Sequence, residues 1–263
     1  MSSLIAAAWR YRGFISSSVV NDFRSRVARS RLGTLWIVLQ PLAQALIFAI
    51  VLSNVLAAKL PGIDNRFAFA VYLLSGLLCW SVFAEIVQRC LTVFIDNASL
   101  LKKMQFPRIS LPLVVVGTAL VSNIALLLVV IILIPMLGVS LTLALLWFPV
   151  LLLITIALAT GIGLLLGTLN VFARDIGQVM LVVMQFWFWM TPVAYPATIV
   201  PGPFQAVLQF NPVATLVMGY HDVFLYGRSP QHSLLYPALL AVISLLLAFF
   251  VFRRASAEMV DAL

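Results

Sequence analysis

The chain has 263 residues, of which 63% are hydrophobic and only 9% carry a charge, whereas about a quarter of residues are charged in a typical soluble domain. A soluble fold of this length could not bury so much apolar surface, but a lipid bilayer can act as its solvent. The net charge of +8 does not indicate nucleic-acid binding, because the basic residues stand at the ends of apolar runs, where they are typical of orientation signals.

Residues 1–34 form a first segment that we expect on the cytoplasmic face of the membrane. Within residues 16–31, Val19, Phe23 and Val27 recur at helical spacing, and arginines occupy the other side. This pattern predicts an amphipathic helix in the membrane interface, acting either as an anchor or as an element that moves with a gate. The arginines are Arg24, Arg26, Arg29 and Arg31.

Six apolar runs are long enough to cross a bilayer, which takes about 20 residues per helix. We therefore predict an all-α integral membrane protein with six transmembrane helices, in which residues 35–253 form one transmembrane domain. No charge interrupts residues 109–173, a stretch that suits two helices turning at Gly138-Val139-Ser140. The predicted spans are 35–58, 67 into the nineties, two within 109–173, then 177–195 and 233–252.

The segment 196–228, between the fifth and sixth spans, is apolar but is broken by Pro201, Pro203 and Asn211-Pro212. Its pieces 204–210 and 213–226 are each too short to cross. Irregular backbone survives at membrane depth only where protein or a cavity surrounds it. We therefore expect a re-entrant pair of half-helices that forms a periplasmic gate.

The basic residues predict the orientation of the chain. With a cytoplasmic N-terminus, only Lys59, Arg66 and Arg228 of the 16 Lys and Arg residues fall on the far side, which is a strong positive-inside bias. Six crossings also place Arg253, Arg254 and the tail 254–263 in the cytoplasm.

The largest cytoplasmic connection is the loop 96–110. Asn97 or Ser99 could cap a short helix that begins there, and Pro107 would stop it. Two interpretations stay open for this loop. It is either a basic loop that fixes the topology, or a helix that inserts apolar side chains into a groove on a partner protein.

Five short blocks follow one another along nearly the whole chain. They are Asp22-x-Arg24 with Ser30-x-Leu32-Gly33-x-x-Trp36-x-x-x-x-Pro41, Asn97-x-x-Leu100 with Lys102-Lys103-Met104-Gln105-Phe106-Pro107-Arg108 and Leu111-Pro112, Asn170-x-x-x-Arg174-Asp175, Thr191-Pro192-x-x-Tyr195, and Phe210-Asn211-Pro212. Together these blocks resemble the ABC-2-type polysaccharide-export permeases, most closely the O-antigen exporter permeases, with teichoic-acid exporter permeases as siblings. One departure is Arg26-Val27, where the family often has an aromatic residue.

The resemblance implies a homodimer in the bacterial inner membrane, paired with two copies of a cytoplasmic ATPase. It also implies a polysaccharide cargo built on an undecaprenyl-diphosphate lipid.

The sequence supports a separate ATPase independently of the resemblance. A phosphate-binding loop needs Gly-x-x-x-x-Gly-Lys-Ser/Thr, and Lys59, Lys102 and Lys103 all lack that context. We expect no cofactor in this chain, with ATP and Mg bound by the partner. The conformational change driven by ATP hydrolysis would then be transmitted from the partner through the loop 96–110. The candidate coupling residues of this loop are Leu100, Lys102, Lys103, Phe106, Pro107 and Arg108.

Aromatic residues cluster from Phe186 to Trp189 near the periplasmic end of the fifth span. They form either an interfacial belt or part of a conduit in which sugar rings slide over aromatic faces. The candidate conduit residues are Trp36, Tyr72, Trp80, Trp187, Trp189 and Tyr195.

Charged residues mark the cytoplasmic opening. Glu85 and Arg89 are four apart on one helix face and can pair, as a structural pair or as a lining of the opening. With Arg24, Arg26, Arg29 and Arg31 they are the candidates for attracting the lipid diphosphate.

Two other functions are less well supported by the residues. His221, Asp222 and His232 lack a further ligand nearby, so we expect no metal site. A membrane enzyme acting on lipid-linked sugars would show clustered acids or histidines, whereas the eight acidic residues here are scattered. Within the exporter class, teichoic acid, lipid or drug cargo remains an alternative.

Overall fold

The computed structural model describes residues 11–28, 67–103, 108–256 and 258–262, together with positions 35, 39, 42 and 43. All regular secondary structure within these residues is helical. The helices are α2 (Arg12–Ala28), α4 (Ala68–Asp96), α5 (Ala98–Lys103), α6 (Ser110–Met136), α7 (Phe148–Phe172), α8 (Asp175–Trp189), α9 (Gly202–Phe210), α10 (Pro212–Phe224), α11 (Leu235–Ala255) and α12 (Met259–Ala262), with short 3₁₀ turns η1 (Leu143–Trp147) and η2 (Ala197–Ile199).

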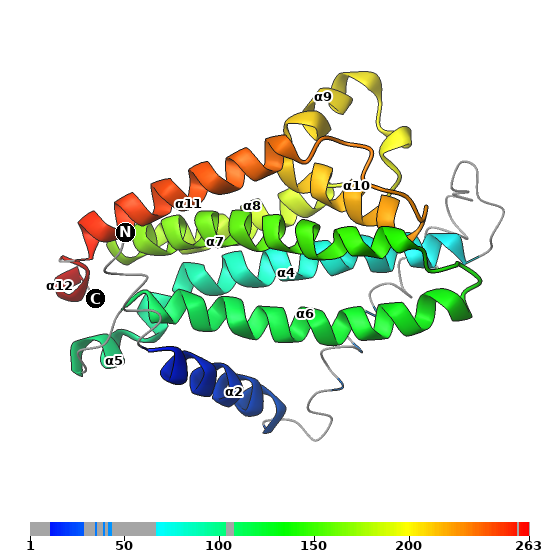
Figure 1. Ribbon diagram of the computed structural model, residues 1–263. Coiled ribbons are helices and arrows are strands. Elements are labelled where there is room, and N and C mark those ends of the chain that lie inside the picture. Colours follow the sequence, from blue (N-terminus) through cyan, green and yellow to red (C-terminus); the bar gives the residue numbers. More distant parts are fainter. Residues whose placement is uncertain are drawn as a thin grey trace.

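Helix α4 is the centre of the bundle (Figure 1). It packs against α6 on one side and against α7 and α10 on the other, while α11 packs on the far side of α7. The most apolar window of α4 is 72% buried, against 22% for the peripheral α11. The more buried α4 is the less apolar of the two helices, so its position in the bundle, and not its composition, accounts for this difference.

Two glycines allow α7 to approach α4 closely. Gly163 and Gly167 lie one turn apart and both face Cys90 of α4, where a Cβ on Gly163 would stand only 2.8 Å from the Cys90 Cβ. A Cβ on Gly167 would collide with the Cys90 carbonyl oxygen. Small residues four apart are typical of helix contacts in membranes, where association depends on close van der Waals packing.

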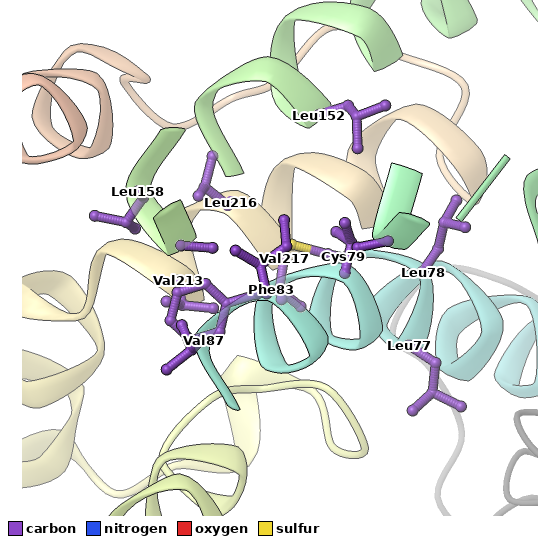
Figure 2. Packing of buried hydrophobic residues seen from close by; sticks show 14 of the residues in the cluster. Leu77, Leu78, Cys79, Phe83, Val87, Leu152, Leu158, Val213, Leu216 and Val217 are labelled. Atoms are coloured by element: carbon purple, nitrogen blue, oxygen red, sulfur yellow. The ribbon is translucent and has the colours of Figure 1, made fainter. Parts of the chain in front are cut away.

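The buried core lies between α4, α7 and α10 (Figure 2). Cys79, Phe83 and Val87 of α4 meet Val213 and Val217 of α10 there. Because α10 is buried along almost its whole length, it acts as a short wedge inside the bundle.

The predicted turn at Gly138-Val139-Ser140 is confirmed. Gly138 has a φ of 79°, a conformation that glycine adopts without steric cost. The Gly138 amide donates to the Pro135 carbonyl at 3.0 Å and the Val139 amide to the Ile134 carbonyl at 3.2 Å. This pairing is the Schellman motif that ends many helices.

Four helices of the described residues are long and apolar enough to cross a membrane: α4, α6, α7 with η1, and α11. They correspond to the predicted spans two, three, four and six. The predicted first span, 35–58, lies almost wholly outside the described residues. The count of six therefore stays a prediction.

The fifth span is shorter than predicted, because α8 ends at Trp189 and not near residue 195. Pro192 explains this end, since proline lacks an amide proton and clashes with the preceding turn of a helix. The chain then turns through residues 190–195. At about 1.5 Å per residue, the 15 residues of α8 extend only about 22 Å.

Two short helices form where half-helices were predicted. Prolines begin both, with Pro203 in the first turn of α9 and Pro212 at the first position of α10, where a missing amide proton costs nothing. Asn211 caps α10 by accepting hydrogen bonds from two of its first amides. The re-entry of this pair into the membrane stays a prediction.

Gly167→Ala should separate α4 from α7. We expect the free energy of unfolding to fall by about 1–3 kcal/mol, because an added methyl group cannot fit against the Cys90 carbonyl. Denaturant unfolding in detergent micelles measures it. Gly13→Ala is the matched control, since no described residue beyond its own stretch of helix lies within 4 Å of its Cβ position; equal stability of the two variants would contradict the predicted clash.

Candidate functional site

The aromatic run at the end of α8 divides into two inward and two outward side chains. Trp187 packs edge-on against Phe83 at 5.2 Å between ring centroids, and Phe188 packs against Trp80 at 5.4 Å. By contrast, Phe186 is 66% exposed and Trp189 is 59% exposed. The inward pair therefore fastens α8 to α4, and the outward pair offers aromatic faces to the surroundings.

An asparagine joins the end of α8 to the start of α10. The Asn211 Oδ1 atom accepts from the Trp187 indole Nε1 at 3.0 Å, and the Asn211 Nδ2 atom donates to the Thr191 hydroxyl at 3.0 Å and the Met190 carbonyl at 3.2 Å. Asn211 belongs to the sequence block Phe210-Asn211-Pro212, but it has no predicted role there, because the sequence does not show which residues an asparagine side chain bonds to.

An apolar groove lies beside this asparagine, with a volume of about 580 Å³. Its walls come from α8 and from the junction of α9 and α10. The lining residues are Val183, Phe186, Trp187, Met190, Phe210, Asn211 and Pro212.

Tyr72 fastens α4 to the turn after α8. Its hydroxyl shares its one proton between the carbonyls of Pro192 at 2.9 Å and Tyr195 at 2.8 Å, and its ring stacks on that of His221 of α10, with 3.6 Å between ring centroids. The Tyr195 hydroxyl in turn donates to the Trp189 carbonyl at 2.7 Å. The Tyr72 side chain is buried, and its predicted role in the conduit stays a prediction.

The C-terminal end of α10 is held by charge. Asp222 accepts from the Arg228 Nε atom at 2.8 Å and from the Gln231 backbone amide at 2.9 Å. The Arg228 guanidinium also lies over the Tyr226 ring, 4.8 Å from its centroid. These contacts fix the loop between α10 and α11.

At the other side of the bundle, Arg89 connects two helices. The predicted pairing with Glu85 is confirmed at 3.6 Å, and the Arg89 guanidinium also meets the Asp22 carboxylate of α2 at 2.6 Å. All three side chains are about a quarter exposed. Asp22 stands in the first sequence block, but nothing in that block indicates that it pairs with a residue 67 positions away.

Helix α2 packs along α6 (Figure 1), and Val19 contacts the Cα side of Gly117. Arg24 is exposed on α2. The side chain of Arg26, and all of Arg29, Arg31 and Trp36, lie outside the described residues. Their predicted roles are therefore untested.

The loop 96–110 contains the short helix α5, as predicted. Leu101 is buried, Leu100 is half-buried and Lys102 is exposed, while Arg108 at the far end of the loop is half-buried. The Lys103 side chain, Phe106 and Pro107 lie outside the described residues. The tail is also partly packed, because Met259 of α12 is fully buried and α12 contacts α5 and α7.

Comparison with known proteins decides the family. The family described as ABC-2 type transporter matches residues 15–225. This chain belongs to that family. The described helices thus form the membrane domain of an ABC-2 transporter, a multi-pass membrane protein that acts as a transport permease and not as an enzyme.

Curated relatives extend the comparison over the whole permease. The O-antigen export system permease protein RfbA of Klebsiella pneumoniae is 28% identical over 207 residues, 78% of each chain. The protein of the same name from Myxococcus xanthus is 27% identical over 266 residues, the full length of both chains. The polysialic acid transport protein KpsM of Escherichia coli is 23% identical over 258 residues, 94% of this chain and 95% of its own.

The pair between Asp22 and Arg89 should hold α2 on this permease. Asp22→Asn should lower the free energy of unfolding by about 1 kcal/mol, as a partly exposed ion pair contributes, and should have almost no further effect in an Arg89→Gln background, where the pair is already lost. Thermal unfolding in detergent measures both. Arg24→Gln, an exposed change on the same helix, should have no effect; an equal loss from Asp22→Asn with and without Arg89 would argue against a direct pair.

Proposed function

We propose that the chain is the membrane subunit of an exporter that carries an undecaprenyl-diphosphate-linked polysaccharide, of the O-antigen type, across the bacterial inner membrane. The observation that carries this proposal is the likeness to O-antigen export permeases over the full length of the chain. The family match covers both the α4–α7 bundle and the half-helices α9 and α10, so it includes the aromatic end of α8 and the groove beside Asn211.

The distribution of charge supports the proposed orientation. The α4–α5 junction, the start of α8 and the end of α11 gather at one end of the bundle (Figure 1). The basic residues of that end are Lys102, Arg108, Arg174, Arg253 and Arg254. Arg228 lies beyond α10, in the loop that precedes α11. By the positive-inside rule, the first end is cytoplasmic.

The proposed topology has six spans. The four long helices, the segment 35–58 and α8 would each cross or nearly cross the hydrocarbon. Because α8 extends only about 22 Å in a core about 30 Å thick, α9 and α10 would fill the remaining periplasmic depth as the re-entrant gate.

Two copies of the chain would form the pathway, powered by two cytoplasmic ATPase subunits that bind ATP and Mg. The segment around α5 is the proposed contact with the ATPase. It lies at the basic end of the bundle, and its packing against α12 would pass motion on to α7.

The residues proposed to contact cargo are the exposed aromatics of α8. Trp189 belongs to the predicted set, and Phe186 is added because its 66% exposed side chain lies three residues before Trp189. Residues three apart share one helix face. Tyr195, which bonds the Trp189 backbone, would complete this group.

A deletion strain tests the cargo. Without this permease, undecaprenyl-diphosphate-linked polysaccharide should accumulate on the cytoplasmic side, because its synthesis continues while its export stops. Mass spectrometry of the extracted lipid fraction would detect it, and the intact gene should reverse it. Accumulation of a teichoic acid polymer, or loss of lipid or drug efflux with no accumulated glycan, would favour the alternative cargo instead.

Changes in the loop 96–110 test the coupling. Replacing Phe106 and Arg108 with alanine should lower export about tenfold while ATP hydrolysis by the assembled complex continues, because the partner would turn over without moving the permease. Arg174→Ala, which removes an exposed charge at the same end, is the control. Normal export by the Phe106 and Arg108 variant would refute this role of the loop.

A further inference from the structure

The carboxamide of Asn211 uses all of its hydrogen-bonding groups within the protein. Its Oδ1 atom accepts from the amides of Val213 and Ala214 at 3.1 and 3.4 Å, in addition to the Trp187 indole. Its Nδ2 atom donates to Met190 and Thr191, as described above. Asn211 is only 8% exposed, so most of its contacts are with the protein.

The bonds form a closed set that we call the Asn211 clasp: Asn211, Trp187, Met190 and Thr191. The Thr191 hydroxyl, which accepts from Asn211, donates in turn to the Trp187 carbonyl at 2.8 Å. The clasp therefore joins the last turn of α8 to the first turn of α10.

One side of the clasp is fixed by the rest of the bundle. Helix α10 is held by the stack of His221 on Tyr72 and by the pair between Asp222 and Arg228, and its apolar side chains fill the space beside α4 (Figure 2). The end of α8 is also held to α4, because Trp187 and Phe188 pack against that helix. Its side-chain hydrogen bonds to the start of α10, within the described residues, all run through Asn211. Asn211 therefore sets the end of α8 relative to α10.

We propose that Asn211 is a positioning residue for export, which keeps Phe186 and Trp189 in one orientation relative to the half-helices. The proposal rests on the proposed function, in which these aromatic faces meet the cargo. The site needs a side chain of this length that both accepts hydrogen bonds from α10 and Trp187 and donates them to Met190 and Thr191. Asparagine does both, whereas aspartate lacks the donor, serine lacks both the reach and the amide, and glutamine is one methylene longer.

A purely local role as the cap of α10 predicts different behaviour. Asparagine and aspartate are about equally good caps, so Asn211→Asp would preserve a capping role. The same change removes the donor to Met190 and Thr191 and would break the clasp. Asn211→Asp compared with Asn211→Ala therefore separates the two roles.

A second pair of variants avoids changing the cap or adding a charge. Thr191→Val removes the hydroxyl at nearly constant shape, whereas Thr191→Ser keeps it. Gln205→Ala deletes an amide on α9 whose Nε2 atom makes one exposed hydrogen bond to the Val200 carbonyl. Thr191→Ser and Gln205→Ala serve as controls.

The experiment measures export and ATP hydrolysis by the complete exporter in cells and in reconstituted vesicles. We expect export to fall about fivefold in Thr191→Val, as the loss of one or two hydrogen bonds implies, and at least tenfold in Asn211→Ala and Asn211→Asp. The two controls should stay within twofold of the native protein. ATP hydrolysis per assembled complex should stay within twofold in every variant.

The orientation of the side chain at position 186 is measured in a separate experiment that does not involve the cargo. In a Phe186→Cys background, a maleimide should label position 186 at a rate that changes at least threefold when Thr191→Val is added and that does not change with Thr191→Ser. The native Cys79 and Cys90 are buried, so the label reports the new cysteine.

Several results would overturn the proposal. Native export in Asn211→Asp would reduce Asn211 to a helix cap, and native export in Thr191→Val would refute the clasp even if Asn211→Ala failed to fold. Equal losses of export and ATP hydrolysis, or an unchanged labelling rate, would likewise contradict a positioning role. A native complex that exports no polysaccharide would instead refute the proposed function, before any variant is compared.

Discussion

The close contact between α4 and α7 is the packing on which the other elements depend. Gly163 and Gly167 remove the side chains that would hold the two backbones apart, and Cys90 of α4 fills the space between them. In lipid there is little hydrophobic gain from pressing two apolar helices together, so the dispersion energy of close packing must supply the attraction. Helices α6, α10 and α11 then pack on the outside of this pair.

Asparagine side chains add direction to this apolar packing. The Nδ2 atom of Asn123 on α6 donates to the Leu78 carbonyl of α4 at 2.8 Å. Asn170 on α7 donates to the Leu91 carbonyl of α4 at 2.9 Å and accepts from the Gly177 amide of α8 at 2.8 Å. With the Asn211 clasp, three amides each connect separate helices. A buried amide that lost its partners would cost free energy, so these contacts select one register among many apolar alternatives.

Polar contacts join helices at both ends of the bundle. At the basic end, Asn170 of α7 bonds to α4 and α8, while α5, α12 and the end of α7 meet through apolar contacts such as the buried Met259. At the other end, Asn211 and Asp222 hold α10 through hydrogen bonds and charge, and Tyr72 stacks on His221 of that helix. These contacts suit the proposed division of labour, in which one end receives motion from a partner and the other keeps aromatic side chains in place beside the cargo.

The sequence alone determined the membrane class, the four long helices, the turn at Gly138 and the two half-helices, because length, charge and proline positions decide these features locally. It also indicated the pairing of Glu85 with Arg89, which are neighbours on one helix. The sequence predicted that the fifth span continues to residue 195, whereas α8 ends at Trp189, although Pro192 indicated this earlier end.

Only the tertiary structure decided which side of each helix faces protein. It turned Trp187 and Phe188 inward and Phe186 and Trp189 outward, buried Tyr72, and brought Asp22 to Arg89 and Asn211 to Thr191. In a soluble helix, the contrast between polar and apolar sides would reveal the inner face. In a bilayer, the lipid-facing and protein-facing sides are both apolar, so that contrast is lost and the inner face depends on shape and on hydrogen bonds between distant residues.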